Sequence, residues 1–318
     1  MSFNEDKEEM LYGESKFRQF WRKLAEQKYL QIMSIAGIIW LLIFCYIPMY
    51  GIIIAFKDYN ITKPITEAPW VGLQHFYDFF SDDNCLMVIK NTLGISLYKL
   101  AVGFPLAIIF ALLLNELSSA KFKRFVQTIS YLPHFLSWVV LGGLMINWLS
   151  DSGMITQLFV KIGLLKEPIA YLAEPKYFWH LVVISDVWKE LGWSAIIYLA
   201  AIAGIDPGLY EAATIDGATR FKKIWFITLP CIKGTIAVLF ILAVSSILNS
   251  NFDQIFVLKN SLNYSASSVV DIYIYQMGMQ LARFSFATAV GLLKSVIALF
   301  LLLAANFVTK KLTDSSLF

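Results

Sequence analysis

Long apolar stretches separated by short polar segments dominate the pattern of hydrophobic positions along the chain. A helix of about 20 predominantly apolar residues crosses the roughly 30 Å of bilayer hydrocarbon. Six stretches reach that length, near residues 30–56, 88–114, 125–149, 178–204, 232–252 and 286–308. We therefore expect an all-α membrane protein with six transmembrane helices in one domain, residues 30–308, between an N-terminal segment, 1–29, and a tail, 309–318.

The segment before the first stretch is basic and amphipathic. Phe17, Phe20, Trp21 and Leu24 recur at three- and four-residue spacing among lysines and arginines. This pattern is typical of a helix on the inner membrane face, and a solvated tail is the alternative. Because no short apolar core with a small-residue cleavage site is present, we expect an uncleaved first span.

Positive charge is distributed unevenly between the two sides of the predicted bundle. With a cytoplasmic N-terminus, the inner segments carry fourteen Lys and Arg residues and the outer segments carry seven. Lys and Arg are enriched in cytoplasmic loops. We therefore expect both termini in the cytoplasm and a multi-pass topology.

The composition narrows the functional classes. Hydrophobic residues make up 58% and charged residues 15% of the 318 positions, against about 45–50% and about 25% in soluble proteins, which excludes an ordinary soluble enzyme. A net charge of +3 gives no indication of a nucleic-acid partner. Cys45, Cys85 and Cys231 fall at different predicted depths, so neither disulfides nor a metal site is expected. No phosphate-binding glycine loop, HExxH or nucleophile motif occurs, so the chain should neither hydrolyse ATP nor act as a membrane enzyme.

Residues 205–231, between the fourth and fifth stretches, are too apolar and helix-prone for a simple tether. Pro207 can begin a helix, Gly217 allows a sharp turn, and Pro230 should bound the next element. The pattern predicts two short helices with a glycine corner, projecting from the cytoplasmic side.

This loop resembles the EAA motif of binding-protein-dependent ABC importer permeases: Glu-Ala-Ala, three residues, Gly, nine residues, Ile-x-Leu-Pro. Every fixed position is filled, by Glu211, Ala212, Ala213, Gly217, Ile227, Leu229 and Pro230. In that family the loop is the coupling helix, which docks into a groove on the ATPase subunit. The resemblance assigns that role to these residues and to Asp216, with Glu211 as a contact or a local brace.

Residues 46–59, 71–76 and 131–138 are similar to the polysaccharide branch of the carbohydrate permeases, the LplB-like proteins. The resemblance implies a type I importer permease in a bacterial cytoplasmic membrane that imports an oligosaccharide or glycan fragment by alternating access. It also implies a second homologous permease, two ATP-binding subunits that hold ATP and Mg²⁺, and an extracellular solute-binding lipoprotein. No cofactor is expected on this chain. An amino-acid or peptide importer and a stand-alone secondary transporter are the alternatives.

Charged residues within the fourth stretch are candidates for the substrate path, because charges inside a membrane usually face the bundle interior or a cavity. Asp186 and Glu190 lie about 12 and 18 Å below its outer end, at about 1.5 Å per residue. Lys189 shares their helix face by its spacing, beside Trp188 and Trp193. Two interpretations remain open: a sugar-lining face, or an ion-pair brace against the partner permease.

Three further polar residues are candidates for the same path. Asn249 and Asn251 would line its entrance or simply end the fifth helix, and Lys99 is too deep in the second stretch to reach the membrane surface easily. His75, His134 and His180 share no ligand spacing, so a metal or acid–base site is not expected.

Overall fold

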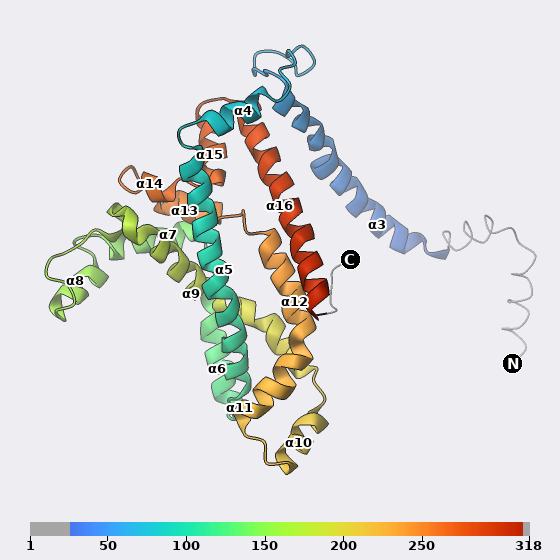
Figure 1. Cartoon of the computed structure of the whole chain (residues 1–318), viewed down its shortest axis with the longest axis vertical. Coiled ribbons are helices and arrows are strands. Elements are labelled where there is room, and N and C mark those ends of the chain that lie inside the picture. The colour runs from blue at the N-terminus through green and yellow to red at the C-terminus, as the bar shows by residue number, and fades with distance from the viewer. Residues whose placement is uncertain (1–25, 314–318) are drawn as a thin grey trace, which may run out of the picture. The chain divides into compact units, whose positions relative to one another are not determined.

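The computed structural model describes residues 26–313, which are almost entirely helical (Figure 1). Between these limits there is no β-strand, only an isolated antiparallel bridge between Lys57 and Trp70. The chain divides into two compact units, residues 1–54 and 55–318. The predicted amphipathic segment, 14–29, falls mostly outside the described residues, as does part of the C-terminal tail.

The first unit consists of one long helical run. Helix α3, Lys28–Leu41, continues through a π-helical turn, Leu42–Tyr46, into a 3₁₀ segment, Ile47–Phe56, whose last two residues belong to the second unit. The change of helix type coincides with Pro48, which lacks the N–H that a regular α-helix needs. The 29-residue run, 28–56, is long and apolar enough to cross a membrane.

The second unit contains three unbroken helical runs of spanning length. Helices α5, Cys85–Asn115, and α16, Phe284–Thr313, are two of them. The third joins α11, Arg220–Lys223, through a π-helical turn, Ile224–Thr228, to α12, Leu229–Ser245. Pro230 lies in the first turn of α12, as predicted, although the helical run continues without a break from α11 through the π turn.

Two further spans are bent. Helix α9, Pro175–Ala203, covers the fourth predicted stretch and meets α10, Pro207–Ile215, at 71°. The third stretch, 125–149, is not the single helix that we predicted: α6, Ala120–Tyr131, a 3₁₀ turn, Leu132–Phe135, and α7, Trp138–Trp148, turn by 95°. Pro133 lies in the turn, and Ser137 accepts from the Val140 N–H to start a new helix. The described part of the chain thus holds four to six spans.

The fifth predicted stretch, 232–252, also ends early. Helix α12 stops at Ser245, and Asn251 adopts a left-handed conformation with φ of 60° before α13, Phe252–Leu258. The remaining elements are short: α4, Gln74–Ser81; α8, Met154–Lys161; a 3₁₀ turn, Tyr171–Ala173; α14, Tyr264–Ser267; α15, Val270–Tyr275; and a π turn, Gln276–Gln280.

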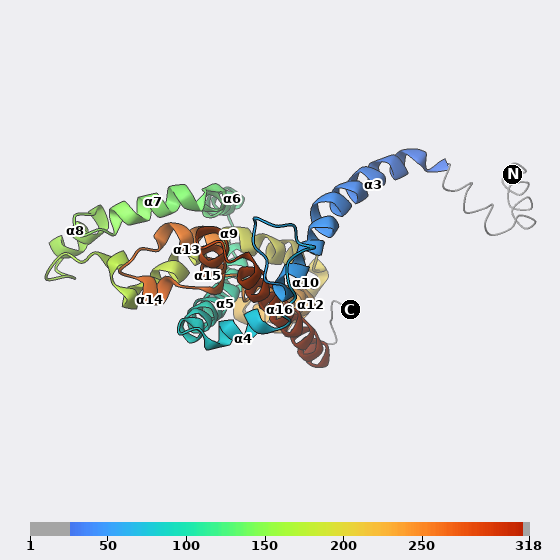
Figure 2. The same ribbon diagram turned by 90° about the horizontal axis from the view of Figure 1, so that it is seen from above.

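Helices α5 and α9 pack along their length and form the centre of the second unit. Towards the α4 end they enclose Ile95, Phe178 and Val182 with residues of α13, and towards the α10 end they enclose Ala111 and Tyr198 with residues of α12. Figure 1 shows α4 at one end of this unit and α10 with α11 at the other. Figure 2 shows α5 among α9, α14 and α16 when the unit is viewed from above. Polar groups that reach the α5–α9 interface are therefore held deep in the bundle.

Candidate functional site

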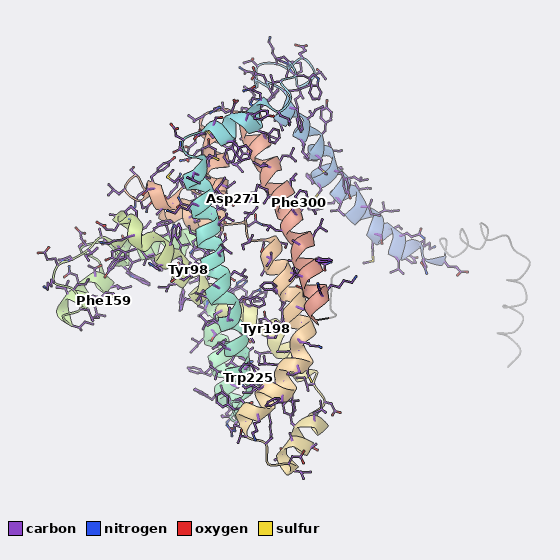
Figure 3. The ribbon with its side chains drawn as sticks, in the orientation of Figure 1. Tyr98, Phe159, Tyr198, Trp225, Asp271 and Phe300 are labelled. Atoms are coloured by element: carbon purple, nitrogen blue, oxygen red, sulfur yellow. The ribbon has the colours of Figure 1, made fainter. Side chains whose placement is uncertain are left out.

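A cavity of about 430 Å³ lies beside the α5–α9 pair, with the last turns of α12 as its third wall. Five of the eight predicted pathway residues line it: Lys99, Asp186, Glu190, Trp193 and Asn249. Ser96 and Ser194 add hydroxyl groups to the lining, and Phe104 and Tyr198 add aromatic rings. Of the residues labelled in Figure 3, Tyr198 lines this cavity, and it lies between Tyr98, towards the α4 end, and Trp225, towards the α10 end.

Lys99 of α5 is at the centre of a polar cluster that joins three helices. Lys99 Nζ lies 3.0 Å from Asp186 Oδ1 on α9 and donates to Gln254 Oε1 on α13 at 2.7 Å. The Asn251 amide donates to the same Asp186 oxygen at 3.1 Å. Gln254, fully buried, also donates to the Val182 carbonyl and the Ser185 hydroxyl. Every charge in this cluster is paired, as a low-dielectric interior demands.

Two polar groups of the cavity keep free bonding capacity. Asp186 bonds only through Oδ1, and no hydrogen bond reaches its Oδ2 from the described residues. The Ser96 hydroxyl is buried and likewise without a partner there. A hydroxyl-bearing ligand would satisfy both groups, since a carboxylate accepts and a hydroxyl does either.

The second charged cluster joins α9 to the bend after α6. Lys189 Nζ donates to the His134 carbonyl at 2.7 Å and to Glu190 Oε1 at 2.9 Å, while His134 Nδ1 lies 2.7 Å from Glu190 Oε2. The His134 ring stacks on Trp193, with centroids 4.3 Å apart and planes 1° apart. These contacts form an ion-pair brace, but it lies within this chain.

Three predicted residues lie outside the cavity lining. Lys189 is 5% exposed and is part of the brace, Trp188 is 53% exposed on the outer face of α9, and Asn251 supports Asp186 from behind. Conversely, the sequence analysis neither selected Gln254 nor joined His134 to this site. A buried glutamine within an apolar helix was the one available signal.

The loop between α9 and α12 contains one short helix, α10, and the predicted glycine corner, but the second predicted short helix, α11, is the start of the long run into α12. Asp206 begins α10 by accepting from the Gly208 N–H at 2.9 Å, and Gly217 has φ of 74°, a conformation that favours glycine. Tyr210 bonds the Thr228 hydroxyl at 2.9 Å, and Lys223 donates to Thr214 at 2.8 Å. These contacts hold α10 against the run that leads into α12.

The predicted docking residues of this loop are accessible. Glu211, Ala212, Asp216 and Gly217 are exposed, whereas Ala213, Ile227 and Leu229 are half-buried. Glu211 makes no hydrogen bond or ion pair with the residues that the structure describes, so the local brace considered for it is not formed. Ile215, the last residue of α10, is 87% exposed. The corner thus presents both a carboxylate and an apolar side chain.

No group of three or more His, Cys, Asp or Glu side chains that could hold a metal occurs within residues 26–313. The charged side chains of the cavity region are bonded to one another or to helix-end carbonyls. This arrangement suits hydrogen bonding to a polar solute more than acid–base chemistry.

Comparison with known proteins identifies the family. Residues 103–314 match the model of the binding-protein-dependent transport system inner membrane component. The chain belongs to this family. Its members are permease components, and the coupling corner between α9 and α12 lies inside the matched region.

Two relatives from Bacillus subtilis (strain 168) cover almost the whole length of this family member. The polygalacturonan/rhamnogalacturonan transport system permease protein YteP is 42% identical over 97% of this chain and 96% of its own, and protein LplB is 41% identical over 93% and 92%. A solved chain of a bacterial ABC transporter involved in import of the acidic polysaccharide alginate is 40% identical, with a TM-score of 0.85, over 93% of this chain and 99% of that one. A chain of a bacterial alginate ABC transporter in complex with an alginate pentasaccharide-bound periplasmic protein is likewise 40% identical, with a TM-score of 0.85.

Proposed function

We propose that this chain is the membrane-spanning permease subunit of an ATP-driven importer for an oligosaccharide or glycan fragment. The observation that carries the proposal is the exposed coupling corner, with Gly217 in its left-handed conformation, at the end of the helix that lines the cavity. Relatives named for glycan transport support the solute class. An amino-acid or peptide solute has no comparable support.

The proposed assembly contains a second homologous permease, two ATP-binding subunits and an extracellular solute-binding lipoprotein. ATP and Mg²⁺ bind the ATPase subunits and not this chain. The complex lies in the bacterial cytoplasmic membrane among its lipids, with both termini and the α10–α11 corner in the cytoplasm. The membrane domain in this proposal is residues 30–308.

In the proposed mechanism, closure of the ATPase dimer moves α10, and α9 and α12 transmit the movement because they flank the corner directly in the chain. The cavity at Asp186 then opens to the binding protein. Asp186 Oδ2, Ser96 and Asn249 offer hydrogen bonds to sugar hydroxyls, and Trp193 offers an apolar face. Hydrolysis restores the inward-facing arrangement. In this mechanism the chain binds the sugar and changes conformation, and the ATPase subunits hydrolyse ATP.

Uptake by the complete complex in proteoliposomes tests this proposal. We expect ATP-driven accumulation of a labelled oligosaccharide that requires the binding protein. The double variant E211A/G217P should assemble but lose most of this uptake, with ATP hydrolysis no longer stimulated by loaded binding protein. Uptake that survives the double variant would contradict the coupling role. Accumulation without an ATPase would instead indicate a secondary transporter.

A further inference from the structure

A second hollow lies at the end of the α5–α9 pair that is farthest from the coupling corner. It is an open hollow of about 720 Å³ between the first turns of α5 and α9 and helix α14, which is within the range of about 300–1,000 Å³ typical of ligand sites. Lys90, Lys176, His180 and Asp83 line it with Trp179. We call this hollow the outer groove.

The back wall of the outer groove is fixed by hydrogen bonds between distant segments. The buried Asn91 amide donates to the carbonyls of Ser265 and Ser268 at 2.9 and 3.0 Å, which ties α14 to α5. Trp179 Nε1 donates to the Ala266 carbonyl at 3.1 Å, which ties α14 to α9. The groove is therefore a built feature of the fold, and α14 lies near both helices in Figure 2.

The charge of the outer groove is unbalanced. It holds the cations of Lys90 and Lys176 but one acidic residue, Asp83. Lys90 makes no hydrogen bond or ion pair within the described chain, and the ion pair of Lys176 is a solvent-exposed contact of 3.8 Å with Glu174. Exposed pairs of this kind contribute little. Both ammonium groups are thus available to an anionic ligand.

His180 can add a third donor. Its Nδ1 lies 3.1 Å from the Tyr98 hydroxyl. When Tyr98 donates to Nδ1, the imidazole hydrogen is on Nε2, which can then donate to a ligand. The cavity of about 430 Å³ beside the α5–α9 pair, the inner cavity, has no such free cation among the described residues, since Lys99 there is already bonded to Asp186 and Gln254. The two hollows therefore suit different parts of a ligand: carboxylates at the outer groove and hydroxyls at the inner cavity.

We propose that the outer groove binds an acidic oligosaccharide, a chain of uronic acid residues, by its carboxylates at Lys90 and Lys176 before the sugar enters the bundle. This inference rests on the proposed function and on its orientation, which places the groove outside the cell. An acidic surface of the binding protein is the competing occupant. The glycan fits better because the lysines border a hollow that also contains the Trp179 indole, whose back wall is fixed by the Asn91 amide and the Trp179 N–H.

Photocrosslinking tests the groove directly. The complete complex in nanodiscs, without binding protein, is labelled with trigalacturonate that carries a diazirine at its reducing end. We expect labelled peptides to include residues 83–91 or 175–180. Neutral galactotriose should compete far more weakly than unlabelled trigalacturonate. The double variant K90Q/K176Q should reduce labelling about two- to thirtyfold, the effect of losing two solvent-exposed charge contacts. The matched control K161Q removes an exposed lysine of α8 and should leave labelling unchanged.

Three results would overturn the inference. They are equal competition by galactotriose, undiminished labelling of K90Q/K176Q, and weakened binding-protein docking in that variant with labelling intact. Uptake assays keep this result separate from the proposed function. If a complex imports a glycan but fails the labelling test, only the proposal about the outer groove is contradicted. If the complex imports no glycan, the proposed function itself is contradicted.

Discussion

Lys99 Nζ lies 3.0 Å from Asp186 Oδ1, which joins α5 to α9 roughly midway along both helices. The two side chains are 14% and 19% exposed, so each charge depends on the other for compensation. The pair also borders the inner cavity. A solute that bonds Asp186 would therefore act on the contact that holds two helices together, which links occupancy of the cavity to the helix arrangement.

Removing one member of this pair should destabilise the protein more than removing both. K99Q or D186N alone leaves a charge uncompensated inside the bundle, and we expect a loss of about 3 kcal/mol, the low end of the range for buried pairs. The double variant K99Q/D186N should recover part of that loss. Thermal unfolding of the purified complex measures all three. Additive losses in the double variant would contradict direct coupling between the two residues.

Gly192 allows α9 to approach α6 closely. A Cβ at this position would lie 2.2 Å from the Ser130 carbonyl oxygen, and small residues permit such contacts between membrane helices. G192A should therefore separate the helices, weaken the nearby His134–Glu190 contact and cost about 1–3 kcal/mol. G143A is the matched control, because nothing lies within 4 Å of a Cβ there. Melting temperatures that fall equally in both variants would refute this packing role.

Gly217 should be required for coupling through its backbone conformation. At φ of 74° an alanine costs roughly 1–2 kcal/mol, which would distort the corner between α10 and α11. We expect G217A to reduce uptake per ATP hydrolysed in proteoliposomes. G163A introduces comparable strain, at φ of 77°, in a different loop and should leave that ratio unchanged. A ratio that is unaffected by G217A would show that the turn does not transmit movement.

Asp82, before α5, should give the protein an acid-sensitive element. Burial raises the pKa of this carboxyl, but the Asn84 N–H at 2.7 Å and the Tyr273 hydroxyl at 2.9 Å favour the carboxylate and prevail, so its pKa is below the ordinary 3.8. The resulting stabilisation is present above pH 3.8 and is lost as the pH falls through the lower folded-state pKa.

The variant D82N tests this dependence. At neutral pH it should melt at a lower temperature than the wild type, and the difference should shrink in increasingly acidic buffer. D83N removes the neighbouring exposed carboxylate and serves as the control. A gap between D82N and wild type that stays constant with pH would exclude the carboxylate of Asp82 as its source.

Much of the fold follows from the sequence because membrane spanning is a local property. Each helix satisfies its own backbone hydrogen bonds, so length and apolar content are enough to find it. The prediction of a single helix over 125–149 was wrong because hydropathy does not record direction: the chain remains apolar through the 95° turn at Pro133. The early end of α12 at Ser245 has a different cause, because four of the next six residues are polar: Ser246, Asn249, Ser250 and Asn251.

The corner between α9 and α12 was determined by local sequence, since Pro207 lies in the first turn of α10 and Gly217 adopts the left-handed turn, as predicted. The polar clusters were decided only by the tertiary structure. Helical spacing put Asp186, Lys189 and Glu190 on one face, yet Asp186 pairs with Lys99, 87 residues away, and Glu190 with His134, 56 residues away. Spacing along one helix determines which side chains share a face, whereas the packing of other helices determines what those side chains meet.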